Sequence, residues 1–349
     1  MPRESYTPGV LVDTANLSEE VWKEWRRKGI GGSDAAAILG ISPFATARDL
    51  YYDKRKILPF DDSEDNWVQK KIGHLLEDLV AEIFHRKTGY RIYQVKKMFH
   101  HPVYPFMLAD IDYFAELPDG STAILEIKTT NYNAKEHWWR DGEKVVPINY
   151  ETQGRHYMCV MNVDRVFYCC LYGNSDDEVI VRDIQRDYAY EEELIALESD
   201  FWNNHVLAQA EPPYTEDGEL ILASVKKHFG KADPAAPAVI LSMPLASCVL
   251  RFTELQEQKR LVDAQSKQLE KDMKRLQGMV VAEMGKSCEA QCCIGGNDFT
   301  VTYKPSSKIG IGKNALERLQ AQHPDIYEEY ATETISRRFY VKKSLEEAA

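Results

Sequence analysis

The sequence predicts a mixed α/β (α+β) fold: a mixed central sheet flanked by helices, followed by a long C-terminal helix with a small α/β extension. Over residues 1–211, helical and strand-like segments alternate in the order helix, strands, helix, strand, which is typical of this class. Residues 246–349 begin with apolar positions seven apart, a pattern that predicts one long helix. Residues 212–245 open with Pro212-Pro213 and show little periodicity, so we expect a connector between two domains.

Composition narrows the class of protein before any motif is considered. The 349 residues are 44% hydrophobic, as in an ordinary globular protein, and no apolar run approaches the roughly 20 residues that span a bilayer. The first residues lack the order of a secretory signal, which favours the cytoplasm and no membrane partner. A formal net charge of −12 argues against coating nucleic acid non-specifically, because that binding depends on phosphate neutralisation. A local basic track on an acidic protein is still compatible with DNA.

Two N-terminal helices are predicted around a glycine pair. Ser18 is a good N-cap for the first helix, which Gly29 would end, and Ser33 can cap a second, short helix. Arg26 lies at the basic end of the first helix, close to Gly31-Gly32. Backbone N–H groups at a helix N-terminus, with an arginine nearby, suit a terminal phosphate. The alternative is a packing turn between two helices, and the local residues alone favour that alternative.

Two further helices are predicted before the first strand of the core. Thr46 is expected to cap one that ends near Lys54, and Ser63 to begin a longer one that ends at Thr88-Gly89. Apolar residues recur at helical spacing in the longer helix and predict one buried stripe, formed by Trp67, Ile72, Leu76, Leu79, Val80, Ile83 and Phe84. Glu77 falls within or beside this stripe. Its carboxylate is costly to bury without a partner, so it is either a salt-bridged boundary residue or part of a metal site.

A β-hairpin with a Pro-Asp-Gly turn is predicted over residues 107–130. Residues two apart on a strand share a face, so Glu126 and Lys128 project from one side of the second strand. Asp110 and Asp112 are also two apart, on the first strand, and could lie opposite that pair. Three acids and a lysine crowded on one face favour a bound cation. The alternative for Glu126 and Lys128 is a surface ion pair.

The remaining segments complete the mixed core. Residues 90–100 are predicted as a strand or a bulged pair of strands before the hairpin. After the hairpin we expect a helix through Met161, strands at 165–172 and 178–184, and a helix from about Tyr190 to the proline pair.

The C-terminal part is predicted as a long helix, from about Ala246 to Met284, and a small α/β unit. Apolar residues seven apart suggest a coiled-coil seam formed by Leu255, Val262, Leu269 and Leu276. Lys259 and Ser266 interrupt its second row. The small unit would contain strands at 298–303 and 337–343 around two helices. Its basic and aromatic residues could follow a DNA backbone or form a plain solvated surface: Tyr303, Lys304, Lys308, Lys313, Arg337, Arg338, Phe339, Tyr340, Lys342 and Lys343.

Taken together, a helix acid, a strand aspartate and a Glu-x-Lys pair resemble the PD-(D/E)XK restriction-endonuclease-like nuclease fold. The closer resemblance is to the phage-type YqaJ recombinase family, relatives of lambda exonuclease, and it covers most of residues 17–173. Five phrases follow the family order: WKEWRRKGIGGSDAAAILGIS, GHLLEDLVAEIF, ADIDYF, ILEIKTT and YETQGRHYMCV. One Glu-x-Lys alone is weak evidence, whereas five phrases in order make a strong match. The tail from about Lys308 also resembles the C-terminal extension of bacterial and prophage members.

The resemblance implies roles for individual residues. The metal ligands that it implies are Glu77, Asp112, Glu126 and the backbone oxygen of Ile127. Lys128 would orient or help to deprotonate the attacking water, and Gln153 would lie beside the site. Burial and a metal would lower the pKa of Lys128 while the acids would raise it, so the sequence leaves its charge state open. Asp110 stands where relatives often have asparagine and could ligate the metal or compete for it.

The resemblance affects the interpretation of two further features. Arg26 and Ser33 match the pocket for a DNA 5′ phosphate in the exonuclease relatives, which favours the phosphate pocket over the packing turn. The odd number of cysteines, seven, predicts reduced thiols. Some nucleases of this fold carry an iron–sulfur cluster, but they typically place one cysteine before the nuclease motif. No cysteine precedes Cys159 here, so we expect no metal on Cys288, Cys292 and Cys293.

The resemblance implies a metal-dependent 5′ to 3′ exonuclease that acts on double-stranded DNA ends in a bacterial or phage-infected cell. Mg²⁺ is the expected cofactor, with Mn²⁺ able to substitute. The exposed 3′ single strand would serve a single-strand annealing protein of the RecT or Bet type. A closed trimeric ring is also compatible with the resemblance. Two alternatives remain at this point: an endonuclease of the same fold in restriction or defence, and a catalytically inactive DNA-end-binding adaptor.

Overall fold

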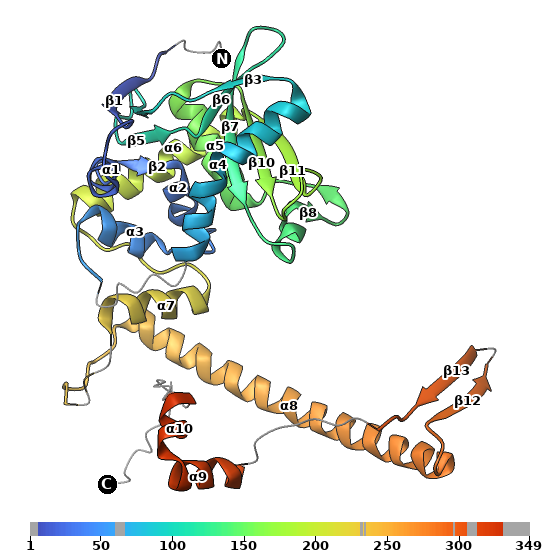
Figure 1. The fold of residues 1–349 in the computed structure, drawn as a ribbon. Coiled ribbons are helices and arrows are strands. Elements are labelled where there is room, and N and C mark those ends of the chain that lie inside the picture. The colour runs from blue at the N-terminus through green and yellow to red at the C-terminus, as the bar shows by residue number, and fades with distance from the viewer. Residues whose placement is uncertain are drawn as a thin grey trace. The chain divides into compact units, whose positions relative to one another are not determined.

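The computed structural model divides into two compact units, Met1–Pro234 and Ala235–Ala349 (Figure 1). It describes residues 6–59, 67–230, 233, 235–295, 297–305 and 313–330. The first unit holds both sheets of the core, and the second holds the long helix. No helix in the described ranges is long and apolar enough to cross a membrane.

The centre of the first unit is a five-stranded sheet with the order β11-β10-β7-β6-β3. Its strands are β3 (Arg91–Tyr93), β6 (Tyr113–Glu116), β7 (Thr122–Thr129), β10 (Arg165–Leu171) and β11 (Val179–Gln185). β7 and β10 run parallel, and the other neighbouring pairs are antiparallel. The mixed central sheet that the sequence predicts is therefore confirmed.

A second, four-stranded sheet has the order β1-β4-β5-β2. Its strands are β1 (Gly9–Asp13), β2 (Ile30–Gly31), β4 (Lys97–His100) and β5 (Met107–Asp110). The prediction of one continuous strand for the first arm of the hairpin is wrong. β5 ends at Asp110 in this sheet, and β6 starts at Tyr113 in the central sheet. Asp112 lies at the break between the sheets. The predicted strand at 90–100 is divided in the same way, into β3 and β4.

Helices of the first unit surround these sheets (Figure 1). They are α1 (Glu19–Arg26), α2 (Gly32–Ile38), α3 (Ala47–Lys54), α4 (Trp67–Thr88), α5 (Ile148–Met161), α6 (Tyr188–Asp200) and α7 (Gly218–Phe229), and α6 continues as a π-helix over Phe201–Leu207. Thr46 caps α3 as predicted, in a reciprocal pair of bonds with Asp49. Ser33 does not cap α2. Gly31 is its N-cap, and the Asp34 carboxylate accepts from the Gly31 N–H at 3.0 Å.

The two faces of the central sheet carry separate apolar clusters. On one face, Leu125 of β7 belongs to a cluster with Val80 and Phe84 of α4. On the other, Ile124 belongs to a cluster with Met158 of α5. Alternate residues of β7 therefore face opposite layers, and Glu126 falls on the α5 side, two positions after Ile124.

The buried stripe predicted along α4 is shorter than expected. Val80, Ala81 and Phe84 are buried, whereas Trp67, Ile72 and Leu79 are exposed. The helix packs only through its second half, where it crosses the sheet, so helical periodicity alone overstated the contact. Its predicted start at Ser63 lies outside the described residues.

Residues predicted as a connector contain the helix α7, which contacts α3. Ser224 Oγ donates to Asp49 Oδ1 at 2.8 Å, and His228 Nε2 lies 2.8 Å from the same oxygen. The Asp217 side chain caps this helix by accepting from Glu219 N, a signal that the prediction of a connector overlooked.

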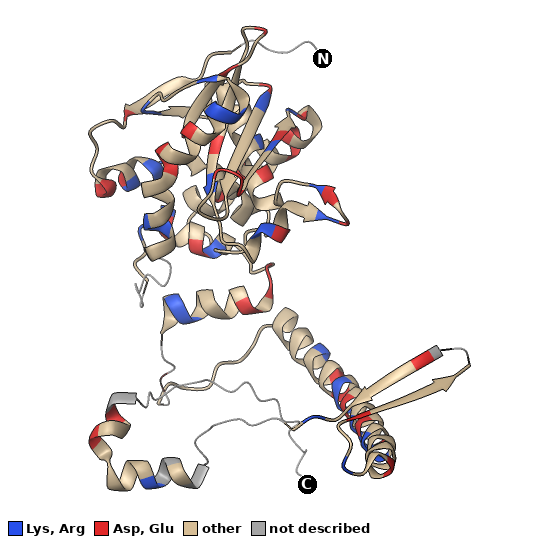
Figure 2. Ribbon diagram, turned by 45° about the vertical axis from the view of Figure 1, so that its right-hand side comes forward, with Lys and Arg blue, Asp and Glu red and all other residues tan. Residues whose placement is uncertain are grey.

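The second unit is built on α8 (Met243–Met284), followed by the hairpin of β12 (Glu289–Ile294) and β13 (Asn297–Thr302) and by α9 (Lys313–Gln322) and α10 (Pro324–Tyr330). Figure 2 shows basic and acidic residues alternating along α8. The predicted strand at 337–343 and its basic residues lie outside the described part. Cys159, Cys169, Cys170, Cys248, Cys288 and Cys292 are free thiols, in line with the predicted reduced state.

Candidate active site

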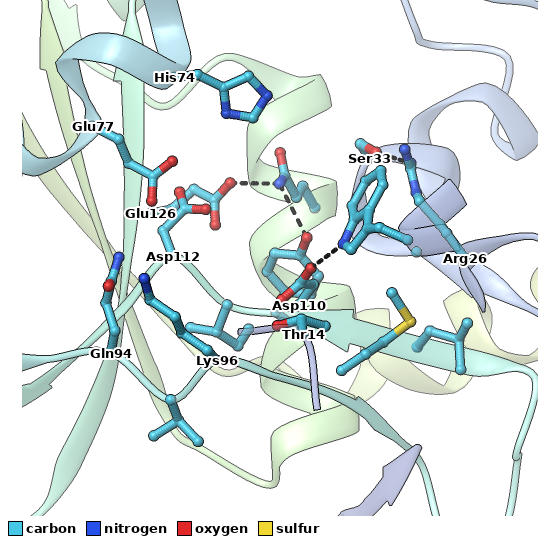
Figure 3. Close-up of a pocket in the computed structure, with 18 residues that line it drawn as sticks. Thr14, Arg26, Ser33, His74, Glu77, Gln94, Lys96, Asp110, Asp112 and Glu126 are labelled. Atoms are coloured by element: carbon cyan, nitrogen blue, oxygen red, sulfur yellow. Dashed lines mark hydrogen bonds between the residues drawn. The ribbon is translucent and has the colours of Figure 1, made fainter. Parts of the chain in front are cut away.

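A pocket of about 480 Å³ opens where the two sheets meet, and it gathers most of the residues singled out from the sequence (Figure 3). Helix α1 contributes Trp22 and Arg26. The carboxylates come from three different elements, and Figure 3 shows Glu77, Asp112 and Glu126 pointing toward one another. The break between β5 and β6 makes this possible, because it places Asp112 at the pocket edge.

Glu126 is the most deeply buried acid of the pocket, with 2% of its surface exposed. Its Oε1 accepts from Lys128 Nζ at 2.6 Å and from Gln153 Nε2 at 2.5 Å. Its Oε2 is buried and has no hydrogen-bond partner among the described residues. A buried carboxylate oxygen without a donor is costly, so Glu126 presents an unsatisfied ligand atom to the pocket.

Gln153 links the acid to the lysine. Its Oε1 accepts from Lys128 Nζ at 3.1 Å while its Nε2 donates to Glu126, so one amide orients both groups. Burial lowers the pKa of Lys128, but the charges of Glu126 and Asp112 outweigh it and the pKa is raised. With no cation bound, the neighbouring acids therefore favour the ammonium form of Lys128.

Asp112 and Glu77 complete the acidic cluster. Burial raises the pKa of Asp112 well above its usual range, and the neighbouring charge of Glu126 adds to this effect. The pKa of Glu77 is raised as well, first by burial and then by the charges of Asp78 and Glu126. Each of these carboxyls favours its protonated form because the others lie close to it. A cation bound between them would stabilise their ionised form.

The backbone of β7 also faces this cluster. Ile127 N donates to Asp112 Oδ2 at 2.9 Å, beyond the last residue pair that β6 and β7 form. Since the N–H and C=O of one strand residue point to the same side, the Ile127 carbonyl is directed to the Asp112 side.

The donor set of this pocket suits a hard divalent cation, which takes carboxylate and carbonyl oxygens. Among the described residues, however, no three His, Cys, Asp or Glu side chains already have the spacing of a metal site. The contacts above give the reason: Lys128 holds one oxygen of Glu126, and Ile127 N holds one of Asp112. The residue types of the pocket therefore fit a hard cation in chemistry.

Asp110 lines the same pocket in a different way. Trp22 Nε1 donates to Asp110 Oδ2 at 2.6 Å, which ties this carboxylate to α1. Burial raises the pKa of Asp110, and the Trp22 bond and Arg26 oppose the shift. Asp110 ends β5 and Asp112 lies in the break that follows, so the two do not share the face of one strand as predicted, although both line this pocket.

Arg26 and Ser33 come together as the sequence led us to expect, and two further residues join them. The Arg26 guanidinium donates to Ser33 Oγ and to Asp34 Oδ1. Lys54 Nζ lies 2.7 Å from Asp34 Oδ2, and only 1% of the Lys54 side chain is exposed. Burial would raise the pKa of Asp34, but Arg26 and Lys54 bring it down to about 2. The Asp34 carboxylate thus lies between two cations, Arg26 and Lys54.

Sequence reasoning missed Asp34 and Lys54 for different reasons. Asp34 was visible as the third residue of a short helix, where acids cap the N-terminus. Lys54 gave no signal, because it looked like an ordinary lysine at the end of α3. A second missed group is the buried pair of His156 and Glu198, with Nδ1 and Oε1 2.7 Å apart. Because His156 Nε2 also contacts Leu108 O at 2.8 Å, this pair fixes α5, and with it Gln153, against β5 and α6.

Comparison with known proteins places these residues within one family. The model of the YqaJ-like viral recombinase domain matches residues 21–164, a range that includes every predicted site residue from Arg26 to Gln153. The uncharacterized protein YqaJ of Bacillus subtilis (strain 168) is 32% identical over 337 residues, covering 96% of this chain and 97% of that protein.

Solved structures that share part of this chain's course include exonucleases. LHK-Exo, an alkaline exonuclease from Laribacter hongkongensis, matches in its complex with dAMP with 20% identity and a TM-score of 0.45, over 55% of this chain and 94% of that chain. A phage-related exonuclease from Haemophilus somnus 129PT matches with 15% identity and a TM-score of 0.38, over 52% and 96%. On the strength of the long match to the Bacillus protein and of the domain model, the chain belongs to the YqaJ-like viral recombinase family.

Proposed function

We propose that this protein is a metal-dependent deoxyribonuclease that degrades double-stranded DNA from its ends in the 5′ to 3′ direction, in the cytoplasm. The observation that carries the proposal is the unsatisfied Oε2 of buried Glu126, which faces Asp112 and Glu77 beside the Lys128–Gln153 pair. Membership of the YqaJ-like viral recombinase family supports the choice of DNA as the substrate.

Glu77, Asp112, Glu126 and the carbonyl of Ile127 would hold the metal, with Mg²⁺ as the expected ion, Mn²⁺ as a substitute and Asp110 as a further candidate ligand. When bound, Mg²⁺ supplies charge stabilisation at the scissile phosphate and favours deprotonation of a water. Lys128, whose pKa the acids raise, would orient the attacking water or donate to a phosphate oxygen. Gln153 keeps the ammonium aimed at the acids by accepting from Nζ at 3.1 Å.

Selection of a 5′ end is proposed for the corner formed by Arg26 and Ser33. The guanidinium has donors in a fork that matches phosphate oxygens, and Ser33 adds a hydroxyl. Asp34 holds Arg26 in place and Lys54 offsets the charge of Asp34, so the corner still attracts an anion. The Trp22 ring also packs against Arg26, with its centroid 5.4 Å from the guanidinium carbon.

The proposal extends to assembly and partner. The exposed residues Leu255, Val262, Leu269 and Leu276 lie seven apart on α8, which has no buried residue among those described. In a coiled coil, a stripe of this period is covered by another helix. We propose that a further copy of this chain supplies that helix, and that a closed trimer is one possible assembly. The exposed 3′ strand would pass to a single-strand annealing protein.

The test uses three duplexes of one sequence: linear with 5′ phosphates, linear with 5′ hydroxyls, and covalently closed circular. We expect Mg²⁺-dependent loss of the linear forms, fastest with the 5′ phosphate, and an intact circle. Cleavage of the circle would indicate an endonuclease instead. Binding to ends without metal-stimulated turnover would indicate an inactive adaptor, and degradation that persists in EDTA would contradict the metal site.

A further inference from the structure

A second hollow, of about 540 Å³, lies beside the C-terminal ends of β7 and β10. It is lined by Lys135, Glu136, Trp139, Asp141 and Tyr172. These residues come from a 3₁₀ turn (η1, Ala134–Trp138) and the short hairpin of β8 (Trp139–Arg140) and β9 (Glu143–Lys144), together with the end of β10. None of them belongs to the pocket described above.

Large aromatic side chains around this hollow are exposed to solvent. Tyr132 is 61% exposed and Trp139 is 39% exposed. Tyr132 meets Tyr172 edge to face, with ring centroids 6.1 Å apart. Exposed rings held by a neighbour lose little further freedom on binding, so their faces are available for stacking at low entropic cost.

Each of these rings has a cation beside it. Lys135 Nζ lies 3.5 Å from the ring centroid of Tyr132 and 5.2 Å from that of Tyr172. The Arg182 guanidinium lies 5.1 Å from the Trp139 ring, and its buried Nε has no hydrogen-bond partner among the described residues. Figure 2 shows charges of both signs on the hairpin, so this surface is not simply basic.

Backbone and ring contacts connect the hollow with the catalytic pocket. Tyr132 follows Lys128 by four residues, and Thr130 N continues the sheet bonding with Leu171 O at 2.8 Å. Lys128 Nζ lies 4.9 Å from the Tyr150 ring, against which buried Trp138 packs at 5.9 Å. A strand whose phosphate reaches Lys128 would therefore pass close to these rings.

The chemistry of the surface fits unpaired bases better than duplex. Aromatic rings with interspersed cations bind single strands by stacking and by neutralising phosphates, whereas bases inside a duplex hide their faces. The acids Glu136 and Asp141 disfavour a phosphate in the hollow itself but can accept from an exocyclic amine. We propose that Tyr132, Trp139 and Tyr172, with Lys135 and Arg182, form a stacking platform for unpaired bases of the DNA strand next to the catalytic pocket. This inference rests on the proposed nuclease function.

The test measures equilibrium binding of the full-length chain to a fluorescent oligodeoxythymidylate and to a blunt duplex, in EDTA so that no hydrolysis occurs. Trp139→Ala and Tyr132→Ala are each expected to weaken single-strand binding about 5- to 150-fold, the range of one lost base stack. Duplex binding should change much less. Trp139→Phe and Tyr132→Phe keep a ring and should retain most of the affinity, which separates stacking from loss of folding.

Tyr188→Ala is the matched control, because Tyr188 is also exposed and also has an arginine over its ring, Arg186 at 4.8 Å. It follows β11, whose end pairs with the opposite end of β10, so its loss should leave single-strand affinity unchanged. Unchanged affinity in the Trp139 and Tyr132 variants, equal losses for both DNA forms, or no single-strand binding by the wild type would each overturn the platform. Single-strand binding without any DNA degradation would instead contradict the nuclease and leave the platform standing.

Discussion

Replacing Asp34 by asparagine tests the charge cluster on which the proposed phosphate corner depends. Asparagine has the shape of a protonated aspartate, so Asp34→Asn removes the negative charge between Arg26 and Lys54 and little else. The pKa of Asp34 is about 2, against an ordinary value of 3.8. This difference corresponds to about 2 kcal/mol of folding free energy, because the carboxylate is almost fully buried and little screened by solvent.

The sign of the pH dependence follows from the depressed pKa. Stability from Asp34 is fully present above pH ~4, where the unfolded chain is also ionised, and it is lost as pH falls through about 2. The free energies of unfolding of wild type and Asp34→Asn should therefore differ by about 2 kcal/mol at pH 7 and by roughly half of that at pH 3, and the difference should vanish at lower pH.

Urea unfolding followed by tryptophan fluorescence measures this gap. All six tryptophans belong to the first unit, so the signal reports the part of the chain that contains Asp34. Glu116→Gln is the control, since the Glu116 side chain is 42% exposed and pairs with Arg91 at 3.0 Å, away from this cluster, and its loss should cost less than about 1 kcal/mol. Equal stability of wild type and Asp34→Asn at pH 7, or a gap that does not shrink in acid, would refute the cluster.

Three further predictions concern the site, its support and assembly. Gln153→Leu removes an acceptor of Lys128 and a donor to Glu126, so we expect a roughly 10- to 100-fold slower digestion of linear duplex with unchanged end binding; a normal rate would contradict the role of the amide. Gly154→Ala places a Cβ 1.9 Å from the Tyr168 hydroxyl and should destabilise the first unit by about 1–3 kcal/mol in thermal melts, whereas Gly218→Ala meets open space and should not. Leu269→Glu should lower the mass seen by sedimentation velocity, while a wild type that sediments as a monomer would exclude self-association through α8.

The parts of the fold that sequence predicted well are those set by short-range pattern. Period-two alternation placed Glu126 and Lys128 on one face of β7, and the five family phrases indicated that Gln153 would join them. Capping chemistry identified Thr46 at the start of α3. Each of these depends on residues that are neighbours along the chain or on a motif long enough to be specific.

The parts that failed depend on contacts between distant segments. The break at Asp112 arises because β5 pairs with β4 while β6 pairs with β7, and alternation within one strand does not reveal a change of sheet. The contact of Lys54 with Asp34 joins two helices whose packing the sequence does not encode locally. The exposed half of α4 shows the same limit, because helical periodicity does not say how far a neighbouring sheet extends.

The most direct measurement compares wild type with Glu126→Gln on linear duplex carrying a 5′ phosphate, in Mg²⁺. Glutamine keeps the size and the contact with Gln153 but removes the charge that would hold the metal. We expect this variant to lose digestion while it keeps end binding and thermal stability. Digestion by Glu126→Gln at the wild-type rate would contradict it.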